Sequence, residues 1–339
     1  MPNRRVLAGF TLLALAVPLA ACSAADPRAT PTAPVVGPAP AATTTAGFQP
    51  VTLDNCGVPV DVGAPPERVV TIKSTPTEML LALGLGERIV GVAYQDGPVP
   101  DEWAADAAGL PVLSDRVPGQ EAVLELAPDF VYAGWESNLS ADGAGDRAVL
   151  AERGIGTYVS PSACQEDGYQ PDPLTFDDVF AEIEEVGAIF GVPERASEVA
   201  ESQRAALDSI EPVTGVSAFW WSSGTDTPYA GGGIGAPNLI LSTAGMTNIL
   251  ADVHETWAPA GWEAVIAADP SVLVLVDASW NTFEHKVEYL ESNPALSQLT
   301  AVQNQRYVRL PFASTEAGVR NVEAAASVAQ QVRELGLGG

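Results

Sequence analysis

Short apolar runs alternate with stretches of helical periodicity along most of the chain. Runs that predict buried strands lie at 69–72, 89–92, 130–132 and 157–159, and again at 216–220, 272–276 and 307–310. Helical periodicity separates them, at 77–83, 121–126 and 144–153 in the first set and at 238–244, 265–268, 287–292 and 317–335 in the second. This alternation predicts an α/β fold with mostly parallel sheets that helices cover on both faces. A β-hairpin is predicted before the first strand, over 51–62, with Asn55-Cys56-Gly57 at its centre.

A long stretch without strand signal lies between the two sets of strands. Helical periodicity covers 177–190 and 194–210, Thr175 is placed to cap the first segment, and Gly191-Val192-Pro193 separates the two. The sequence leaves open whether they form one kinked helix or two helices in series. The economical interpretation is two Rossmann-like lobes, at 48–174 and 212–339, joined by a single helical spine at 175–211.

One helix-to-strand unit occurs in both predicted lobes. Glu121-Ala122-Val123-Leu124, followed by Pro128 and an apolar run, is matched 142 positions later by Glu263-Ala264-Val265-Ile266, Pro270 and another apolar run. In both copies the proline forbids further helix. Chance similarity of a common pattern is the alternative. A solenoid would repeat every few tens of residues, so this long period favours two lobes of similar design.

The N-terminus has the pattern of a lipoprotein signal peptide over 1–21. Arg4 and Arg5 precede an apolar stretch, and Leu19-Ala20-Ala21-Cys22 resembles the bacterial lipobox. The resemblance implies that Cys22 is acylated and anchors the protein outside the cytoplasmic membrane; an ordinary secretory signal ending in Cys is the alternative. Ala, Pro and Thr dominate 22–47, which predicts a flexible tether. We therefore expect an extracytoplasmic, lipid-anchored protein.

Charge and cysteine content narrow the function further. The formal net charge of −27 argues against nucleic acid or anionic lipid as partners. Apart from Cys22, the chain has only Cys56 and Cys164. An even pair in an exported protein is most simply a disulfide, so we expect these two to be bridged rather than free.

Several short motifs follow one another along the chain in a characteristic order. In the first lobe they are Pro65-Pro66-Glu67-Arg68-Val69-Val70, Thr77-Glu78-Met79-Leu80-Leu81-Ala82-Leu83-Gly84-Leu85 with Ile89-Val90-Gly91-Val92, and Pro128-Asp129-Phe130-Val131. In the second lobe they are Ala244-Gly245-Met246-Thr247-Asn248-Ile249, Trp262-Glu263, Asp269-Pro270 and Ala301-Val302-Gln303-Asn304-Gln305-Arg306-Tyr307. Together, over 51–335, they resemble the solute-binding proteins of ABC importers for ferric siderophores and cobalamin.

This resemblance implies the class III periplasmic-binding-protein fold, with a small-molecule ligand held in the cleft between the lobes. In that family one glutamate on each lobe ion-pairs with arginines of the permease dimer. Those positions fall on Glu121 and Glu263, the leading residues of the repeated unit. The alternative is that both are ordinary acidic residues favoured by the helix dipole. We further expect a monomer that is not an enzyme and holds no cofactor.

Candidate ligand contacts come mainly from the residues that follow each strand. Ligands of open α/β sheets bind beyond the carboxyl ends of the strands. The candidates are Lys73, Ser74, Thr75, Tyr94, Trp135, Glu136 and Arg147 in the first lobe, and Trp221, Ser222, Tyr229, Trp257, Trp280, Phe312 and Arg320 in the second. The set is aromatic with a few polar groups, as expected for a large, partly aromatic ligand.

Lys73 is one of only two lysines in the chain. In the cleft, with Arg147 and Arg320, it would suit an anionic ligand; the alternative is a solvated residue at the lip. Among the tryptophans, Trp220 and Trp262 are expected in the core, and Trp221 and Trp257 nearer the cleft.

The family resemblance makes a ferric siderophore the leading ligand. The runner-up is a deazaflavin coenzyme precursor, because 134–145 and 311–320 resemble an actinobacterial branch proposed to import it, and cobalamin is a further alternative. His254 and His285 are the only histidines, too few for a bare-metal site. No convergent nucleophile set is recognisable. An exported enzyme and a surface adhesion module remain less favoured alternatives.

Overall fold

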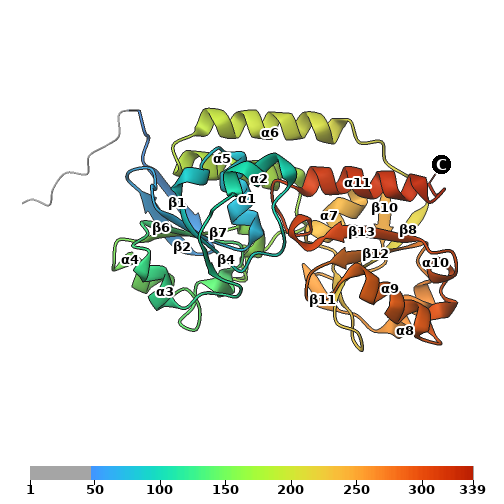
Figure 1. The fold of residues 1–339 in the computed structure, drawn as a ribbon. Helices are drawn as coiled ribbons and strands as arrows, with labels where there is room; N and C mark the ends of the chain where they lie inside the picture. The colour runs from blue at the N-terminus through green and yellow to red at the C-terminus, as the bar shows by residue number, and fades with distance from the viewer. Residues whose placement is uncertain (1–46, 339) are drawn as a thin grey trace, which may run out of the picture. The chain divides into compact units, whose positions relative to one another are not determined.

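A computed structural model describes residues 47–338 of the chain. The predicted signal peptide, the acylation at Cys22 and nearly all of the tether lie outside these residues. Within 47–338, no helix combines the length and apolar character needed to cross a membrane. The described residues form two α/β lobes, each built around its own sheet (Figure 1).

The first lobe contains a five-stranded parallel sheet of order β5-β4-β3-β6-β7. Its strands are β3 (Val69–Ile72), β4 (Ile89–Ala93), β5 (Val112–Ser114), β6 (Phe130–Ala133) and β7 (Gly156–Val159). Helices α1 (Ser74–Ala82) and α5 (Phe176–Ile189) cover one face, and α3 (Gln120–Glu125) and α4 (Arg147–Ala151) the other. Side chains alternate between these faces, so Phe130 packs with α5 while Val131 packs with α3. Two covered faces explain why the strand runs are continuously apolar.

The predicted hairpin precedes this sheet as β1 (Val51–Asn55) and β2 (Val58–Val62), paired antiparallel. Its two loop residues, Cys56 and Gly57, have φ angles of 53° and 75°. A two-residue hairpin turn of type I′ requires positive φ at both of these positions. The expected disulfide is present between Cys56 and Cys164, and it ties the hairpin to the chain that follows β7.

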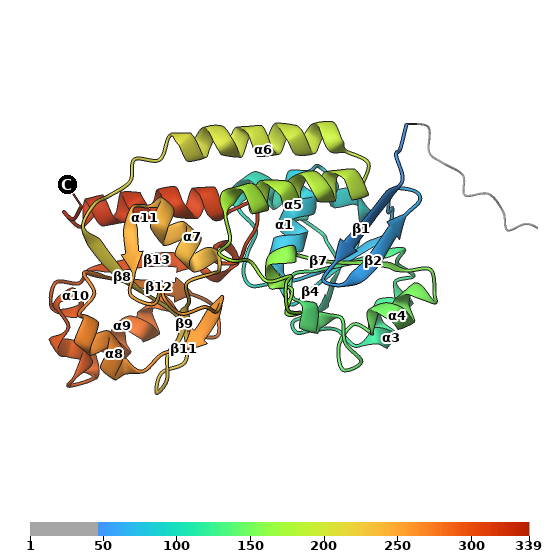
Figure 2. The ribbon, with the colours of Figure 1, turned by 180° about the vertical axis from the view of Figure 1, so that it is seen from behind.

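The second lobe repeats this layered design with a six-stranded sheet of order β11-β9-β8-β12-β13, in which β10 also pairs with β8. The parallel strands are β8 (Val216–Ser223), β10 (Met246–Asn248), β12 (Val272–Asp277) and β13 (Tyr307–Pro311), and the antiparallel ones β9 (Tyr229–Gly231) and β11 (Trp257–Pro259). Helices α7 (Ala236–Thr243) and α11 (Asn321–Glu334) pack on one face. Helices α8 (Trp262–Ala268), α9 (Phe283–Ser292) and α10 (Thr300–Gln303) pack on the other (Figure 2).

The elements that the sequence pattern did not predict are all short. They include β5, β9, β10, β11, α10 and α2 (Ala104–Ala107), each of three or four residues. A segment this short does not complete enough periods to separate strand, helix and loop. The closing helix α11 also begins later than expected, at Asn321, because residues 312–320 form a turn of 3₁₀ helix and a loop between the lobes.

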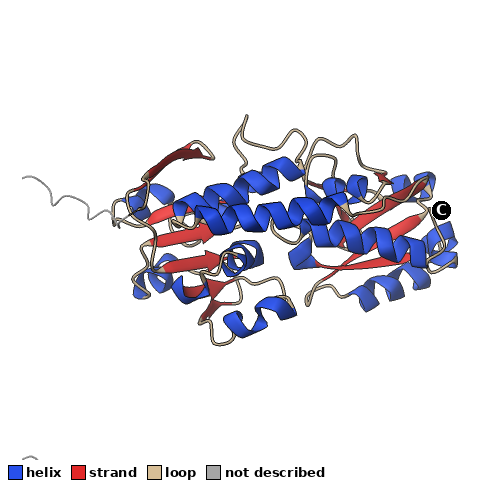
Figure 3. Cartoon of the chain, turned by 90° about the horizontal axis from the view of Figure 1, so that it is seen from above, coloured by secondary structure: helices blue, strands red, loops and turns tan. Residues whose placement is uncertain are grey.

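The connection between the lobes consists of two helices that double back, α5 and α6 (Pro193–Asp208). Gly187 of α5 lies against Ala196 of α6, and Glu184 pairs with Arg204 at 3.1 Å, so the two helices run antiparallel. Figure 3 shows them side by side, together with α11. Of the two possibilities that the sequence left open, the spine is therefore two successive helices, which reverse direction between Ile189 and Pro193, and not one kinked helix. Only α6 runs from one lobe to the other, donating from Arg195 to Ala82 and from Gln203 to Val319.

The repeated unit occupies equivalent places in the two lobes. One copy forms α3 and then β6, the other α8 and then β12. The residues just before the two prolines, Ala127 and Asp269, both adopt positive φ, at 45° and 37°. Left-handed backbone is uncommon for residues other than glycine. Its recurrence at matching positions shows that the sequence echo is a structural repeat.

Candidate functional site

A cavity of about 740 Å³ lies between the two lobes, within the size range of small-molecule sites. Eight of the predicted ligand contacts line it: Thr75, Tyr94 and Trp135 from the first lobe, and Ser222, Tyr229, Trp257, Trp280 and Phe312 from the second. Most of them follow the carboxyl ends of strands, as expected for a sheet of this kind. The structure thus brings residues from distant parts of the sequence to one place.

Aromatic rings form much of the cavity surface. Trp257 stacks on Phe312 with ring centroids 6.5 Å apart and planes 12° apart, and Trp280 meets Phe312 edge-on at 5.5 Å. On the opposite lobe, Tyr94 meets Trp135 edge-on at 5.6 Å. Trp280 is 56% exposed and stands at the mouth. Such a surface offers broad stacking area to a ring-bearing ligand.

Lys73 is buried behind these rings, with only 1% of its side chain exposed. Its ammonium group forms an ion pair with Asp96, and Glu316 lies 3.9 Å away. The same nitrogen sits 3.8 Å from the ring centre of Trp135 and 4.9 Å from that of Phe312. Lys73 is therefore neither the solvated lip residue nor the open ligand contact that the sequence suggested. It is the cation of a closed ion pair beneath the cavity floor.

The backbone at this point is unusual. Lys73 has φ 84° and ψ 162°, a region that residues other than glycine essentially avoid. Tyr94, at the end of the neighbouring strand, also has positive φ, at 52°. Gly134 crosses closely above, because a Cβ there would lie 2.8 Å from the Cβ of Lys73. The three strand ends are thus packed tightly around the buried ammonium group.

Glu316 joins the lobes at the floor of the cavity. Its Oε1 accepts a hydrogen bond of 2.5 Å from the indole N–H of Trp135, and its Oε2 has no hydrogen-bond partner. Burial raises the pKa of Glu316 to about 7, although the nearby charge of Lys73 acts in the opposite direction. Glu316 is thus a buried carboxyl group of the second lobe held against a cation and an indole of the first.

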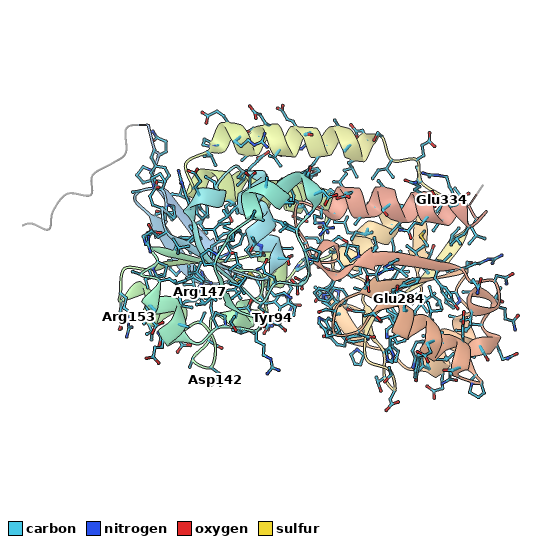
Figure 4. All side chains as sticks on the ribbon, viewed as in Figure 1. Tyr94, Asp142, Arg147, Arg153, Glu284 and Glu334 are labelled. Atoms are coloured by element: carbon cyan, nitrogen blue, oxygen red, sulfur yellow. A yellow bond between two sulfur atoms is a disulfide. The ribbon has the colours of Figure 1, made fainter. Side chains whose placement is uncertain are left out.

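Three other predicted contacts in the first lobe do not line the cavity. Arg147 points into the interior of that lobe, where it donates to the backbone oxygen of Asn55 at 2.7 Å and to Thr157 at 3.0 Å (Figure 4). It supports the hairpin instead of contributing charge to the cleft. Glu136 accepts a hydrogen bond from the backbone N–H of Gln165 and does not line the cavity. Ser74, the third such residue, is buried and bonded to Asp96.

The placement of Trp221 also differs from expectation. Strand β8 runs to Ser223, three residues beyond its predicted end, so Trp221 lies within the strand. Side chains alternate along it, and Trp220 and Trp221 are both fully buried, on opposite faces of the sheet. Trp220 and Trp262 are core residues as predicted, and Trp257 reaches the cavity.

Arg320 forms a second link between the lobes instead of a ligand contact. It pairs with Glu78 of α1 at 3.3 Å, and its side chain is 13% exposed. Burial raises the pKa of Glu78 to about 8, against the lowering effect of Arg320. Both basic residues expected to help Lys73 attract an anion are therefore engaged within the protein.

Three acidic residues of the site are not among those predicted from the sequence. Asp96 pairs with Lys73, Glu316 lies on the floor, and Glu255 lines the cavity beside Trp257. Asp96 comes directly after Tyr94-Gln95, and Glu316 shortly after Phe312. Both therefore follow the carboxyl end of a strand, where ligand-binding residues are expected, and could have been predicted on that ground. Glu255 precedes the short strand β11, which carries no clear periodic signal.

Glu121 and Glu263 lie in the first turns of α3 and α8 and are exposed. Neither lines the cavity. The structure places them at equivalent positions of the repeated unit, one on each lobe.

A family model described as "Periplasmic binding protein" matches residues 69–313 of the chain. An uncharacterised ABC transporter substrate-binding lipoprotein of Bacillus subtilis is 26% identical over 84% of this chain and 85% of its own length. A vitamin B12-binding protein of Yersinia pestis is 27% identical over 62% of this chain and 69% of its own. Among solved structures, an ABC-type Fe3+-hydroxamate transport protein of Saccharomonospora viridis superposes with a TM-score of 0.71. It is 27% identical, over 83% of this chain and 98% of that one.

Proposed function

The chain belongs to the periplasmic binding protein family as a substrate-binding protein of an ABC importer, and we propose that its cargo is a ferric siderophore. The observation that carries the proposal is the aromatic cavity between the lobes, which is large enough for a compact metal chelate. The similarity to a protein named for Fe3+-hydroxamate transport supports the same class of cargo.

Cobalamin is the second candidate. A relative named as a vitamin B12-binding protein supports it, and the stacked rings of Trp257 and Phe312 would suit a corrin ring as well as a siderophore. The deazaflavin precursor, which the resemblance of 134–145 and 311–320 suggested, loses the support that Lys73 would give as a free cation. That ammonium group is already paired with Asp96.

The cargo is tested by titrating the purified protein with ferric siderophores, cobalamin and deazaflavins while following tryptophan fluorescence. Trp257 and Trp280 line the cavity, so a bound ring or iron complex is expected to quench their emission. Quenching by a ferric hydroxamate at micromolar concentration or below supports the proposal. Quenching by cobalamin alone would replace the siderophore with the second candidate.

We further propose that Glu121 and Glu263 dock the loaded protein on the permease dimer. Both are exposed in the first turn of equivalent helices, and a surface ion pair is weak enough for reversible contact. Replacing both by Ala is expected to leave ligand binding unchanged and to abolish uptake. Glu125→Ala with Glu288→Ala, which removes two other exposed carboxylates, is the matched control. Undiminished uptake in the first variant would refute the docking role.

Anchoring through an acylated Cys22 completes the proposed arrangement, supported by the similarity to a substrate-binding lipoprotein. A Cys22→Ser variant is expected to leave the membrane fraction and appear in the medium. Retention of that variant on the membrane would show that another segment holds it.

A further inference from the structure

We infer that the cleft selects against anionic ligands and favours a cargo that carries a cationic group. This inference rests on the proposed function, because it concerns the ligand of the same cavity. It names the charge class of that ligand, which the family alone does not fix.

The charged side chains that line the cavity, among the described residues, are both acidic. Glu316 lies on the floor with 9% of its side chain exposed, and Glu255 lies at the rim beside Trp257. Oε1 of Glu316 accepts the indole N–H of Trp135, and its buried Oε2, which has no hydrogen-bond partner, lies 3.9 Å from Nζ of Lys73. A carboxylate in this partly desolvated position attracts a cation more strongly than it would in water.

The nearest cation, Lys73, does not cancel the negative charge of these two carboxyl groups. Lys73 lies behind Trp135 and Phe312, and its charge is compensated by Asp96 in contact and by Glu316 at 3.9 Å. With Glu316 ionised, the three groups together carry one net negative charge. An anion on the cavity floor would meet that charge and could reach the ammonium group only by displacing the rings.

The two arginines that could make the charge of the cavity positive are bound to other residues of the protein. Arg147 is held by Asn55 and Thr157 inside the first lobe, and Arg320 is paired with Glu78. Both are also largely buried. Turning either toward the ligand would leave buried acceptors or a buried carboxyl group without a partner, which is costly.

The indole rings near the mouth of the cavity also favour a cation. Trp257 and Trp280 line the cavity and are not among the rings over which Lys73 sits. The face of an indole ring attracts a cation, most strongly where water is excluded. A cationic group between these rings and Glu255 would be attracted both by the faces of the indole rings and by the charge of the carboxylate. Neutral tris-hydroxamate complexes and amine-bearing ones fit this cleft, and anionic tris-catecholate complexes do not.

The test uses two probes of nearly the same shape and opposite charge, tetraphenylphosphonium and tetraphenylborate. Binding to the purified full-length protein is measured by calorimetry at physiological ionic strength, which screens distant surface charge. The measurement is made at pH 8, because the pKa of Glu316 is about 7 and the group is then ionised. We expect the phosphonium ion to bind at least tenfold more tightly. Equal affinity, tighter binding of the borate, or no binding of the phosphonium would overturn the inference.

Two variants separate the cleft from the overall charge of −27. Glu316→Gln keeps an acceptor for the indole N–H of Trp135 and removes the charge, so the preference for the cation is expected to fall about tenfold. Glu334→Gln removes one exposed carboxylate at the far end of α11 and is expected to leave the preference unchanged (Figure 4). An equal effect of both variants would assign the preference to the surface and refute the inference.

A siderophore series tests the cargo and its charge separately. It compares the gallium complex of a linear tris-hydroxamate that bears a free amine with the same complex after succinylation of that amine. Tighter binding of the amine form supports both proposals, and tighter binding of the succinylated form contradicts the charge preference. If neither complex binds, the siderophore proposal fails, while the phosphonium and borate pair still decides the charge class.

Discussion

At the scale of single residues, Lys73 shows what the sequence can and cannot predict about a side chain near the site. Its rarity and its place after a strand predict a ligand contact, but the structure buries it beneath the cavity floor in an ion pair with Asp96. Its role depends on Asp96 and Glu316, the second of which lies far away in sequence. A local pattern cannot show whether a lysine faces a ligand or a carboxylate of its own protein. The same limit applies to Arg147 and Arg320, whose partners are also distant.

The burial of Lys73 leads to a prediction about stability. Lys73→Met leaves the buried carboxylate of Asp96 without its partner, at a side-chain exposure of 3%. Removing one member of a buried ion pair typically costs about 3–5 kcal/mol. We expect the free energy of unfolding, measured by urea denaturation, to fall by an amount of that order.

Adding Asp96→Asn to the Lys73→Met variant removes the unpaired charge. The double variant is therefore expected to be more stable than Lys73→Met alone, as a double-mutant cycle would show. A single variant within about 0.5 kcal/mol of the native protein, the range typical of surface substitutions, would mean that the pair is not desolvated as the structure indicates.

At the scale of elements, hydrophobic periodicity predicts most long strands and helices because both sheets are covered on two faces. It fails where tertiary contacts extend or reverse an element. Strand β8 continues through Trp221 because a second layer of helices covers that side. The reversal between α5 and α6 depends on Gly191, at φ 70°, and on close packing between the two helices. The Gly-Val-Pro break marks the boundary but not the angle between the helices.

The close approach of α5 and α6 gives a second prediction. A Cβ on Gly187 would lie 2.2 Å from the Cβ of Ala196, far inside van der Waals contact. Gly187→Ala gains about 1 kcal/mol of helix propensity, but overpacking of this kind costs about 1–3 kcal/mol. We expect thermal unfolding of the variant at a lower temperature than that of the native protein.

The compensating substitution Ala196→Gly moves the methyl group from one helix to the other. Combined with Gly187→Ala, it is expected to recover part of the lost stability. If Gly187→Ala alone raises the melting temperature, the helices are not packed as closely as the structure shows and propensity decides the outcome.

At the scale of the whole molecule, the two-lobe α/β architecture follows from the sequence, and so does the internal repeat. The polar links between the lobes do not, because each joins residues far apart in the chain: Glu78 with Arg320, Lys73 with Glu316, and Trp135 with Glu316. These contacts decide the charge of the cleft, so the identity of the cargo cannot be inferred from local motifs alone. They also bury carboxyl groups in a protein that is already strongly acidic.

The buried carboxyl groups predict how stability depends on pH. Burial raises the pKa of Glu78 to about 8, and that of Glu182 and Glu316 to about 7, from an ordinary value of 4.5. The unfolded chain releases these protons near pH 4.5, whereas the folded protein keeps them until pH 7–8. The folded state therefore binds more protons in this window, and the free energy of unfolding falls as pH rises through it. We expect a higher melting temperature at pH 5 than at pH 8.

Repulsion within a chain of net charge −27 acts in the same direction, so a variant must separate the two causes. Glu182 is buried and accepts a hydrogen bond of 2.8 Å from Tyr132, whereas Glu184 on the same helix is exposed and pairs with Arg204. Glu182→Gln removes a titrating group that the folded state keeps protonated, so it is expected to flatten the decline between pH 5 and pH 8. Glu184→Gln removes the same formal charge and is expected to leave the slope unchanged. Equal slopes in all three proteins would assign the pH dependence to general repulsion rather than to the buried carboxyl groups.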